Sequence, residues 1–175
     1  MVKLINFSTK VLIIFLASFF VLIFSSFIYF SSGLPDYNKL ADYQPPISSR
    51  VYSKDGKLLA EYAIEKRIFV PIDAIPKTVI NSFLSAEDKN FFDHPGVDAK
   101  GILRAVINNV KNIMGNKRLE GASTITQQVA KNFLLTNEVS IKRKIKEAIL
   151  AFRIEKAYTK KRILELYLNQ IYLGQ

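Results

Sequence analysis

The sequence has no cysteine, no tryptophan and only one histidine among its 175 residues. The missing cysteines exclude a disulfide scaffold, a zinc site with thiolate ligands and a thiol nucleophile. A single histidine also excludes a His-rich metal site. In contrast, 49% of the residues are hydrophobic and 12% are aromatic. This composition excludes a disordered chain and indicates a folded protein of about one domain.

Acidic residues are scarce in the second half of the chain. Residues 1–98 hold 10 basic and 10 acidic side chains, whereas residues 99–175 hold 15 basic and only 5 acidic ones. The whole net charge of +10 therefore lies in the C-terminal 77 residues. Such a one-sided distribution indicates an anionic partner, which could be nucleic acid, membrane headgroups or a phosphorylated substrate.

Charged residues are absent from residues 11–30, which form a continuous apolar run. A helix of twenty residues spans about 30 Å, the hydrocarbon thickness of a bilayer. Lys3 and Lys10 precede it, so the positive-inside bias places the N-terminus in the cytoplasm and the rest of the chain outside. A cleaved signal peptide is the alternative, although its apolar core would be shorter. We predict a cytoplasmic tip and transmembrane signal anchor over residues 1–33.

A linker and a β-hairpin are predicted to follow the anchor. Residues 34–49 contain three prolines, which oppose a regular helix, so this stretch is interpreted as a linker. Residues 50–70 are predicted to form a β-hairpin around Asp55-Gly56, which is a strong two-residue turn signal. The hairpin opens a domain that is predicted to occupy residues 50–175.

Five helices are predicted from residue 76 onward, which makes the fold mainly α. Pro76 suits a first helical position, and its helix should fade near residues 87–89. The second and third helices should end near Gly115 and Leu135, and Gly174 suits the stop of the last one. Polar N-cap residues open the other four helices: Asp98, Thr124, Ser140 and Thr159.

Two of these helices have clear apolar faces at helical spacing. The face of the helix after Asp98 comprises Ile102, Leu103, Val106, Ile107 and Val110. The stripe of the helix after Ser140 comprises Ile141, Ile145, Ala148, Ile149 and Phe152. The sequence then stops at Gln175 directly after a helix, from which we expect a domain that is truncated on its C-terminal side.

Four segments carry residues that could do chemistry. In the first, an acidic pair, Glu87-Asp88, lies at a helix end beside Phe91, Phe92 and the single His94. The two phenylalanines could partly shield Glu87 from water and favour its use as a base. A pair of solvated acids with Phe91 in the core explains the same spacing.

The second and third segments could bind an anion. Residues 120–128 run into a helix N-terminus with hydroxyls and free N–H groups, followed by Lys131 and Asn132. An ordinary capped helix is the alternative. Residues 142–146 hold four cations before Glu147, which suits a phosphate-binding face. A helix ion pair, a solvated basic face or a face near lipid headgroups are the alternatives. The fourth segment, residues 160–169, indicates only an amphipathic helix.

The four segments together, in this order and outside an anchor, resemble the family-51 peptidoglycan glycosyltransferases. The resemblance is to the N-terminal part of class A penicillin-binding proteins of the 1A type, and it covers the anchor, the linker and residues 50–175. It rests on four motifs: Glu87-Asp88-x-x-Phe91-x-x-His94-x-Gly96, Gly121-Ala122-Ser123-Thr124-Ile125-Thr126-Gln127-Gln128, Arg143-Lys144-x-x-Glu147 and Lys161-x-Ile163-Leu164-Glu165-x-Tyr167-Leu168-Asn169.

The resemblance implies a helical, lysozyme-like glycosyltransferase domain that polymerises lipid II and releases undecaprenyl pyrophosphate. It implies that Glu87 is the general base for the acceptor hydroxyl and that Glu147 is a second catalytic glutamate. Arg143 and Lys144 would hold the pyrophosphate. The remaining residues with implied roles in the pocket or in substrate binding are Phe91, His94, Ser123, Thr124, Gln128, Lys131 and Asn132.

The resemblance also implies partners and a location. These are the growing glycan strand, the lipid bilayer and other cell-wall synthesis proteins, at the bacterial inner membrane with the catalytic domain on its outer side. A divalent metal, Mg²⁺ or Mn²⁺, could assist at the pyrophosphate, and no nucleic acid is expected. Two alternatives stay open: an inactive, membrane-anchored fragment that binds lipid II, and a lysozyme-like enzyme that cleaves glycans.

Overall fold

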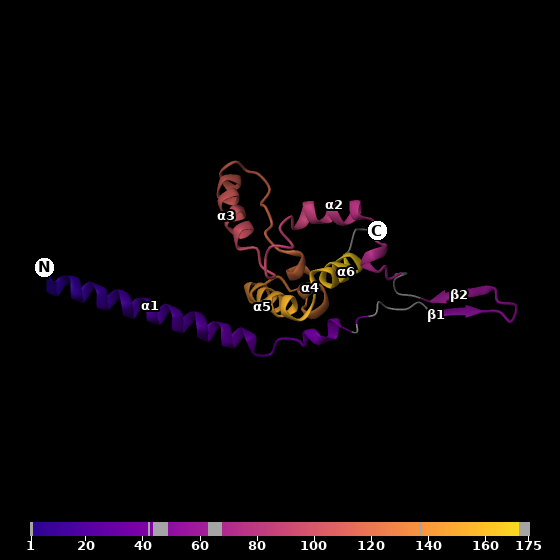
Figure 1. The fold of residues 1–175 in the computed structure, drawn as a ribbon, viewed down its shortest axis with the longest axis horizontal. Helices are drawn as coiled ribbons and strands as arrows, with labels where there is room; N and C mark the ends of the chain where they lie inside the picture. Colours follow the sequence, from indigo (N-terminus) through magenta and orange to yellow (C-terminus); the bar gives the residue numbers. More distant parts are fainter. Residues whose placement is uncertain (1, 42, 44–48, 63–67, 137, 172–175) are drawn as a thin grey trace.

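A computed structural model describes residues 2–41, 43, 49–62, 68–136 and 138–171. The described part is mainly helical, as predicted, with one short antiparallel sheet (Figure 1). In chain order its elements are α1 (Val2–Ser31), η1 (Tyr37–Leu40), β1 (Ser49–Tyr52), β2 (Leu58–Tyr62), η2 (Ile72–Ala74), α2 (Lys77–Glu87), α3 (Ala99–Met114), α4 (Ile125–Leu134), α5 (Ile141–Ala157) and α6 (Lys160–Gln170), where η marks a short 3-10 helix.

The core lies where α4, α5 and α6 meet in the middle of the molecule (Figure 1). Each helix contributes apolar residues three or four positions apart, which fall on one face of a helix. Partly buried residues of α2 pack against this cluster from the side. The buried members of the three central helices are Ile125, Val129, Ala130, Leu150, Ile154, Ile163, Leu164, Leu166 and Tyr167.

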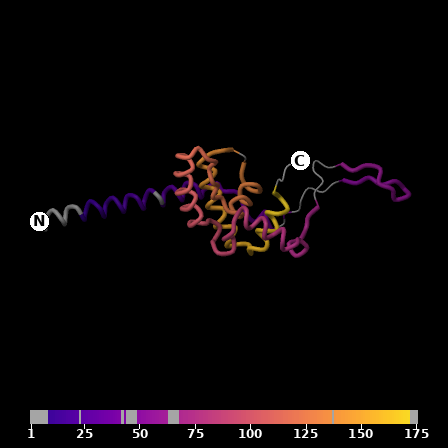
Figure 2. The backbone as a smooth tube through the Cα atoms, turned by 90° about the horizontal axis from the view of Figure 1, so that it is seen from above, coloured from indigo at the N-terminus to yellow at the C-terminus, as the bar shows by residue number. Residues whose placement is uncertain are grey.

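Helix α1 extends away from this core (Figures 1 and 2). Residues Thr9–Ser31 are long and apolar enough to cross a membrane, and none of that stretch is buried within the protein. Its last turn meets α5, where the Arg153 guanidinium donates to the Ser31 hydroxyl at 3.3 Å. The predicted linker is in part packed against the domain, because Leu40 of η1 is buried in the core.

Strands β1 and β2 form the predicted hairpin. They are antiparallel, with Val51 opposite Ala60, and an irregularity after Val51 shifts the register. Asp55-Gly56 lies in the turn between them, and Gly56 has the positive φ of 76° that such a turn needs. The hairpin projects from the opposite end of the molecule to α1 (Figures 1 and 2). The predicted extension through residues 63–67 lies outside the described residues.

All four polar N-caps are confirmed. Asp98, Ser140 and Thr159 each accept a hydrogen bond from the backbone N–H three residues on, at 2.9 to 3.3 Å. Thr124 forms a complete capping box. The helix predicted to begin at Pro76 starts one residue later, since α2 begins at Lys77 with Pro76 as its N-cap. The predicted stop at Gly174 falls outside the described residues.

The apolar stripe predicted for α5 is wrong. Ile149 is its only fully buried member, while Ile141 and Phe152 are exposed. The buried face instead follows Glu147, Leu150, Ala151 and Ile154, a row rotated around the helix. Both rows have helical spacing, and the packing of α4 and α6 decides between them. The five residues predicted to share a face of α3 are all exposed: Ile102, Leu103, Val106, Ile107 and Val110.

A row of asparagines fastens α3 to the loop that follows it, residues 116–121. Asn108 donates to the Glu120 carboxylate at 2.8 Å, and Asn109 exchanges two hydrogen bonds with the Glu120 backbone. One turn later, Asn112 donates to the Arg118 carbonyl at 3.2 Å. Because the contacts repeat along the helix, α3 and this loop form one arm of the structure.

The fourth sequence segment ties α6 to the chain that precedes α2. Glu165 accepts from the Ile72 N–H at 2.8 Å. Asn169, on the same face of α6, both accepts from the Val70 N–H and donates to its carbonyl, at 2.8 and 2.9 Å. The polar face that looked merely amphipathic in sequence therefore positions the segment that leads into α2.

Candidate active site

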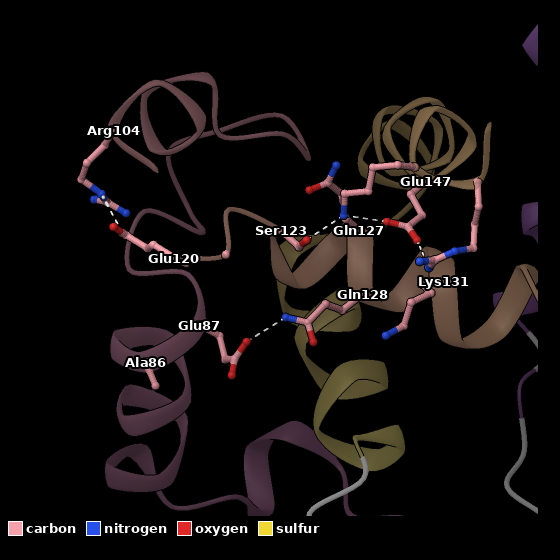
Figure 3. Close-up of a pocket in the computed structure, with 12 residues that line it drawn as sticks. Ala86, Glu87, Arg104, Glu120, Ser123, Gln127, Gln128, Lys131 and Glu147 are labelled. Carbon is pink, nitrogen blue, oxygen red and sulfur yellow. Dashed lines mark hydrogen bonds and ion pairs between the residues drawn. The ribbon is translucent and has the colours of Figure 1, made fainter. Parts of the chain in front are cut away.

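A cavity of about 510 Å³ is bordered by the C-terminal end of α2, the N-terminal part of α4 and the first turns of α5 (Figure 3). Its wall is almost entirely polar or charged. Seven of the residues predicted for the site line it together: Glu87, Ser123, Gln128, Lys131, Arg143, Lys144 and Glu147. The first three of the four sequence motifs therefore contribute side chains to one cavity.

Glu87 is the last residue of α2, and its side chain is exposed at the cavity. Its Oε2 accepts a hydrogen bond from the Gln128 side-chain amide at 2.9 Å (Figure 3). Of the two interpretations of this segment, the one with Phe91 in the core is confirmed for Phe91 and for the exposed Glu87, whereas Asp88 is buried and Phe92 is exposed. The carboxylate is thus held by one polar contact from α4 and is open to a ligand.

The opposite wall is a cluster of charges around Glu147. This carboxylate is 2% exposed, and its oxygens pair with the Arg143 guanidinium and, at 2.8 Å, with the Lys144 ammonium. Lys144 also donates to the Ser123 hydroxyl at 2.6 Å, which joins α5 to the segment before α4 (Figure 3). The helix ion pair considered in sequence therefore exists, and its burial holds two cations at the cavity wall.

The two cations of this wall and Lys131 are not fully neutralised. Arg143 Nε is buried and has no hydrogen-bond partner in the part of the chain that the structure describes. Lys131, in the last turns of α4, lines the same cavity and forms no ion pair with any described residue. Three cations and one paired carboxylate leave this wall with a net positive charge, which suits an anionic ligand.

Asp88 joins the two helices that border the cavity. It is 7% exposed and accepts from the Ile125 N–H, the first of α4, at 3.0 Å. Both its oxygens lie 3.0 Å from His94 Nε2, while His94 Nδ1 accepts from the Gly96 N–H at 3.2 Å. An accepting Nδ1 places the imidazole proton on Nε2, so a neutral His94 donates to Asp88.

Four predicted site residues lie beside the cavity or beneath it. Phe91 and His94 are buried and do not line it. The Thr124 hydroxyl is already engaged, since it donates to the Gly96 carbonyl at 2.6 Å and accepts from the Gln127 N–H. Asn132 is exposed and lies away from the lining. The substrate contacts predicted for these four residues stay predictions.

The structure adds lining residues that the sequence did not indicate. Arg104 of α3 approaches Glu120 of the following loop, with Nε 3.4 Å from Oε1 (Figure 3). Both also line a second hollow of about 270 Å³, which shares Glu87 and Ser123 with the first. Arg104 lies outside the four sequence motifs, so no motif indicated it. No local pattern indicates its pairing with a loop 16 positions further on.

The side chains of the cavity offer few free oxygen ligands to a divalent metal. Both oxygens of Glu147 are taken by cations, and no group of three or more His, Asp or Glu side chains suited to a metal occurs among the described residues. Mg²⁺ and Mn²⁺ are held by several oxygen ligands. The described residues therefore form no metal site of their own, and the divalent metal expected at the pyrophosphate stays a prediction.

An exposed carboxylate facing a cationic wall is an arrangement that can deprotonate one group and hold an anionic one. Comparison with known proteins agrees with that chemistry. The model of the family described as Transglycosylase matches residues 55–175, and the chain belongs to this family. The match covers the hairpin turn and all the elements around the cavity.

Particular relatives narrow the class further. The chain is 60% identical over 147 residues to penicillin-binding protein 1A of Rickettsia felis, and 50% identical over 142 residues to proteins of the same name from Aquifex aeolicus and Neisseria flavescens. These alignments cover 81–84% of this chain. They cover only 17–19% of the relatives, so the chain spans about a fifth of their length.

Proposed function

We propose that this chain carries the glycosyltransferase site of a peptidoglycan polymerase, which joins lipid II units into glycan strands and releases undecaprenyl pyrophosphate. The observation that carries the proposal is the shared cavity of about 510 Å³, with the Glu87 carboxylate on one side and Lys131, Arg143 and Lys144 on the other. Membership of the Transglycosylase family supports the reaction class.

Glu87 is proposed to be the general base. It is the one carboxylate of the main cavity without a cationic partner in the described part of the chain, because Glu120 pairs with Arg104 and Glu147 with Arg143 and Lys144. An exposed carboxylate can reach the 4-hydroxyl of an incoming lipid II. The hydroxyl proton passes to Glu87 while the hydroxyl oxygen forms the new bond to the anomeric carbon.

The cationic wall is proposed to stabilise the leaving group. As the bond from the anomeric carbon to the pyrophosphate oxygen breaks, its electron pair stays on the pyrophosphate. Lys131 and Lys144 are the donors available for that charge, and the guanidinium of Arg143 adds its positive charge to the same wall. Attack from the Glu87 side, opposite the leaving group, inverts the anomeric centre. Glu147 itself would act by holding the two cations in place.

The apolar helix α1 is proposed to keep the enzyme at its lipid-linked substrate. It supplies a candidate membrane span, with the positive N-terminal residues on the cytoplasmic side and the cavity on the outer side of the inner membrane. Anchoring both partners in one bilayer raises their effective concentration. The growing glycan strand and other cell-wall synthesis proteins are the partners proposed with it.

The test is the substitution Glu87→Gln, which keeps the shape of the side chain and removes the base. Loss of a general base lowers a rate by about 10²- to 10⁴-fold. We expect polymerisation of fluorescent lipid II, in detergent micelles and followed by gel separation of glycan strands, to fall by that factor. Binding of lipid II should persist, because the cationic wall is untouched. Glu138→Gln, an exposed site outside the cavity, is the matched control.

Other outcomes would support a different function. Polymerisation at the wild-type rate by Glu87→Gln would contradict the role of Glu87. Lipid II binding by the wild-type chain without any strand growth would support a binding fragment. Release of soluble muropeptides from purified cell wall would support a glycan-cleaving enzyme, although such an enzyme has no use for the cationic wall.

A further inference from the structure

One buried polar atom has no place in the proposed reaction, namely the hydroxyl of Tyr167. Tyr167 belongs to α6, and only 1% of it is exposed. Its hydroxyl has no hydrogen-bond partner among the described residues. Buried hydroxyls are nearly always paired, because burial removes the water that would otherwise bond to them. A phenylalanine would fill the core equally well, so packing alone does not explain the oxygen.

The ring of Tyr167 lies under the face of α2 that carries Glu87. Phe83 and Glu87 are four residues apart on α2 and therefore share one face. The Phe83 ring packs edge-on against the Tyr167 ring, with centroids 6.1 Å apart and an interplanar angle of 81°. One helical turn thus separates the residue in contact with Tyr167 from the proposed base.

The charges agree with this placement. Burial, and after it the negative charge of Glu87, raise the pKa of the Tyr167 hydroxyl. The hydroxyl therefore keeps its proton well above the ordinary tyrosine pKa of 10.0, so at neutral pH it can donate to a carboxylate. An ionised carboxylate is the strongest acceptor that such a donor can meet in a protein.

Glu87 has an oxygen to spare for this donor. Its Oε2 is bonded to Gln128 of α4, on the cavity side. No hydrogen bond reaches its Oε1 from any residue that the structure describes. Helices α4 and α6 pack together in the core, so a donor on each can approach the same carboxylate from two directions.

We propose that Tyr167 is a positioning residue for Glu87, and that in the free protein Glu87 turns between the cavity, where Gln128 holds it, and α6, where the Tyr167 hydroxyl donates to it. The inference rests on the proposed function only for what Glu87 does to a substrate. In each of the two orientations one donor bonds to the carboxylate, and the donor on α6 favours its ionised form because the hydrogen bond is made to the charged state.

The experiment compares Tyr167→Phe with the wild-type chain, in detergent micelles without substrate. The pH at which Glu87 binds its proton is followed by NMR of the labelled side-chain carboxyl carbon, assigned with Glu87→Gln. Loss of a hydrogen bond to the ionised form should raise that titration midpoint by about 0.5 pH unit. The other charges that line the cavity are the same in both proteins: Arg104, Glu120, Lys131, Arg143, Lys144 and Glu147. Asp88, next to Glu87, is also unchanged.

Tyr158→Phe is the matched control. Its hydroxyl makes a real hydrogen bond, to the Tyr37 carbonyl at 3.0 Å, away from the cavity. We expect Tyr158→Phe to lower the melting temperature and to leave the Glu87 titration unchanged. Tyr167→Phe should instead shift the Glu87 titration, because it removes the donor that we assign to this carboxylate. A merely structural tyrosine would not move the titration.

The outcomes separate this inference from the proposed function. An identical Glu87 titration in Tyr167→Phe and in wild type would overturn the positioning role, whatever the activity. A shifted titration in a protein that does not polymerise lipid II would leave the role intact and refute the function. Where polymerisation is measured, Tyr167→Phe should lower kcat several-fold with KM unchanged, because orientation of the base matters only once substrate is bound.

Discussion

Asp88 shows how one buried carboxylate can fix a site without touching its ligand. It receives hydrogen bonds from His94 and from the first N–H of α4, and it directly follows Glu87 in sequence. The end of α2 and the start of α4 are therefore held by the same side chain. The backbone N–H also meets the carboxylate at the positive end of a helix dipole, where negative charge is favourable.

Replacement of Asp88 by Asn should loosen this junction. Asn keeps one acceptor oxygen, but its amide nitrogen then lies beside the His94 Nε2–H donor, and the negative charge at the start of α4 is lost. We expect a loss of about 1–3 kcal/mol in the free energy of unfolding, measured by urea titration. Weaker lipid II binding should accompany it. The exposed Asp93 is the control, and Asp93→Asn should stay within about 0.5 kcal/mol of wild type. Equal stability of the two variants would contradict this account of Asp88.

Sequence reasoning located the residues of the cavity better than it described their surroundings. Lys144 and Glu147 could be assigned because their motif fixes both residue type and spacing. Whether Phe91 shields Glu87 or lies in the core could not be decided from the sequence. The direction of Phe91 depends on contacts with α4 and α6, which no local pattern encodes. Thr124 likewise has a hydroxyl that fits either a cap or a ligand, and only the structure shows it bonded to Gly96.

At the scale of helices, starts were easier to predict than buried faces. An N-cap such as Ser140 acts within three residues of its own position, so the sequence contains all the information it needs. The buried face of α5 depends on which of two apolar rows meets the neighbouring helices. The buried row includes a charged residue, Glu147, which is unusual for a core face. Its burial is possible only because Arg143 and Lys144 pair with it.

The cap of α3 should make this helix sensitive to acid. The Gly101 N–H is the main cause that lowers the pKa of Asp98 below its ordinary value of 3.8. A lowered folded-state pKa means that the ionised cap stabilises the fold above about pH 3.8, and that this stability is lost as the pH falls through the folded-state pKa. Asp98→Asn keeps a good cap without the charge.

We therefore expect wild type and Asp98→Asn to melt at similar temperatures near pH 7. Below about pH 3.8 the melting temperature of the wild type should fall, because its cap becomes protonated, and that of the variant should change less over the same range. Circular dichroism melting in detergent micelles measures both. Parallel pH profiles for the two proteins would show that Asp98 makes no acid-dependent contribution to the stability of α3.

For the molecule as a whole, α1 is the element whose role can be tested most directly. Val21 lies near the middle of the candidate span and is exposed along it. An arginine at the centre of a bilayer-spanning helix costs about 2.5–3.5 kcal/mol. We expect Val21→Arg to lower the fraction of protein that stays in carbonate-washed membranes.

The control places the same charge near the end of the helix. Val11→Arg lies beside Lys10, where a long side chain can extend its charge to the membrane surface. It should remain in the membrane fraction like the wild type. If Val21→Arg were retained as fully as Val11→Arg, α1 would not be crossing the hydrocarbon core.

The asparagine row that fastens α3 to residues 116–121 has one further consequence. Arg104 and Glu120 belong to the same arm, whereas Glu87 belongs to α2. If α3 moves, the Arg104–Glu120 pair therefore moves with it, and the ion pair stays intact. What changes is the gap between that pair and Glu87. The width of the hollow that Glu87, Arg104 and Glu120 line therefore depends on the position of α3, a helix whose apolar side chains are exposed.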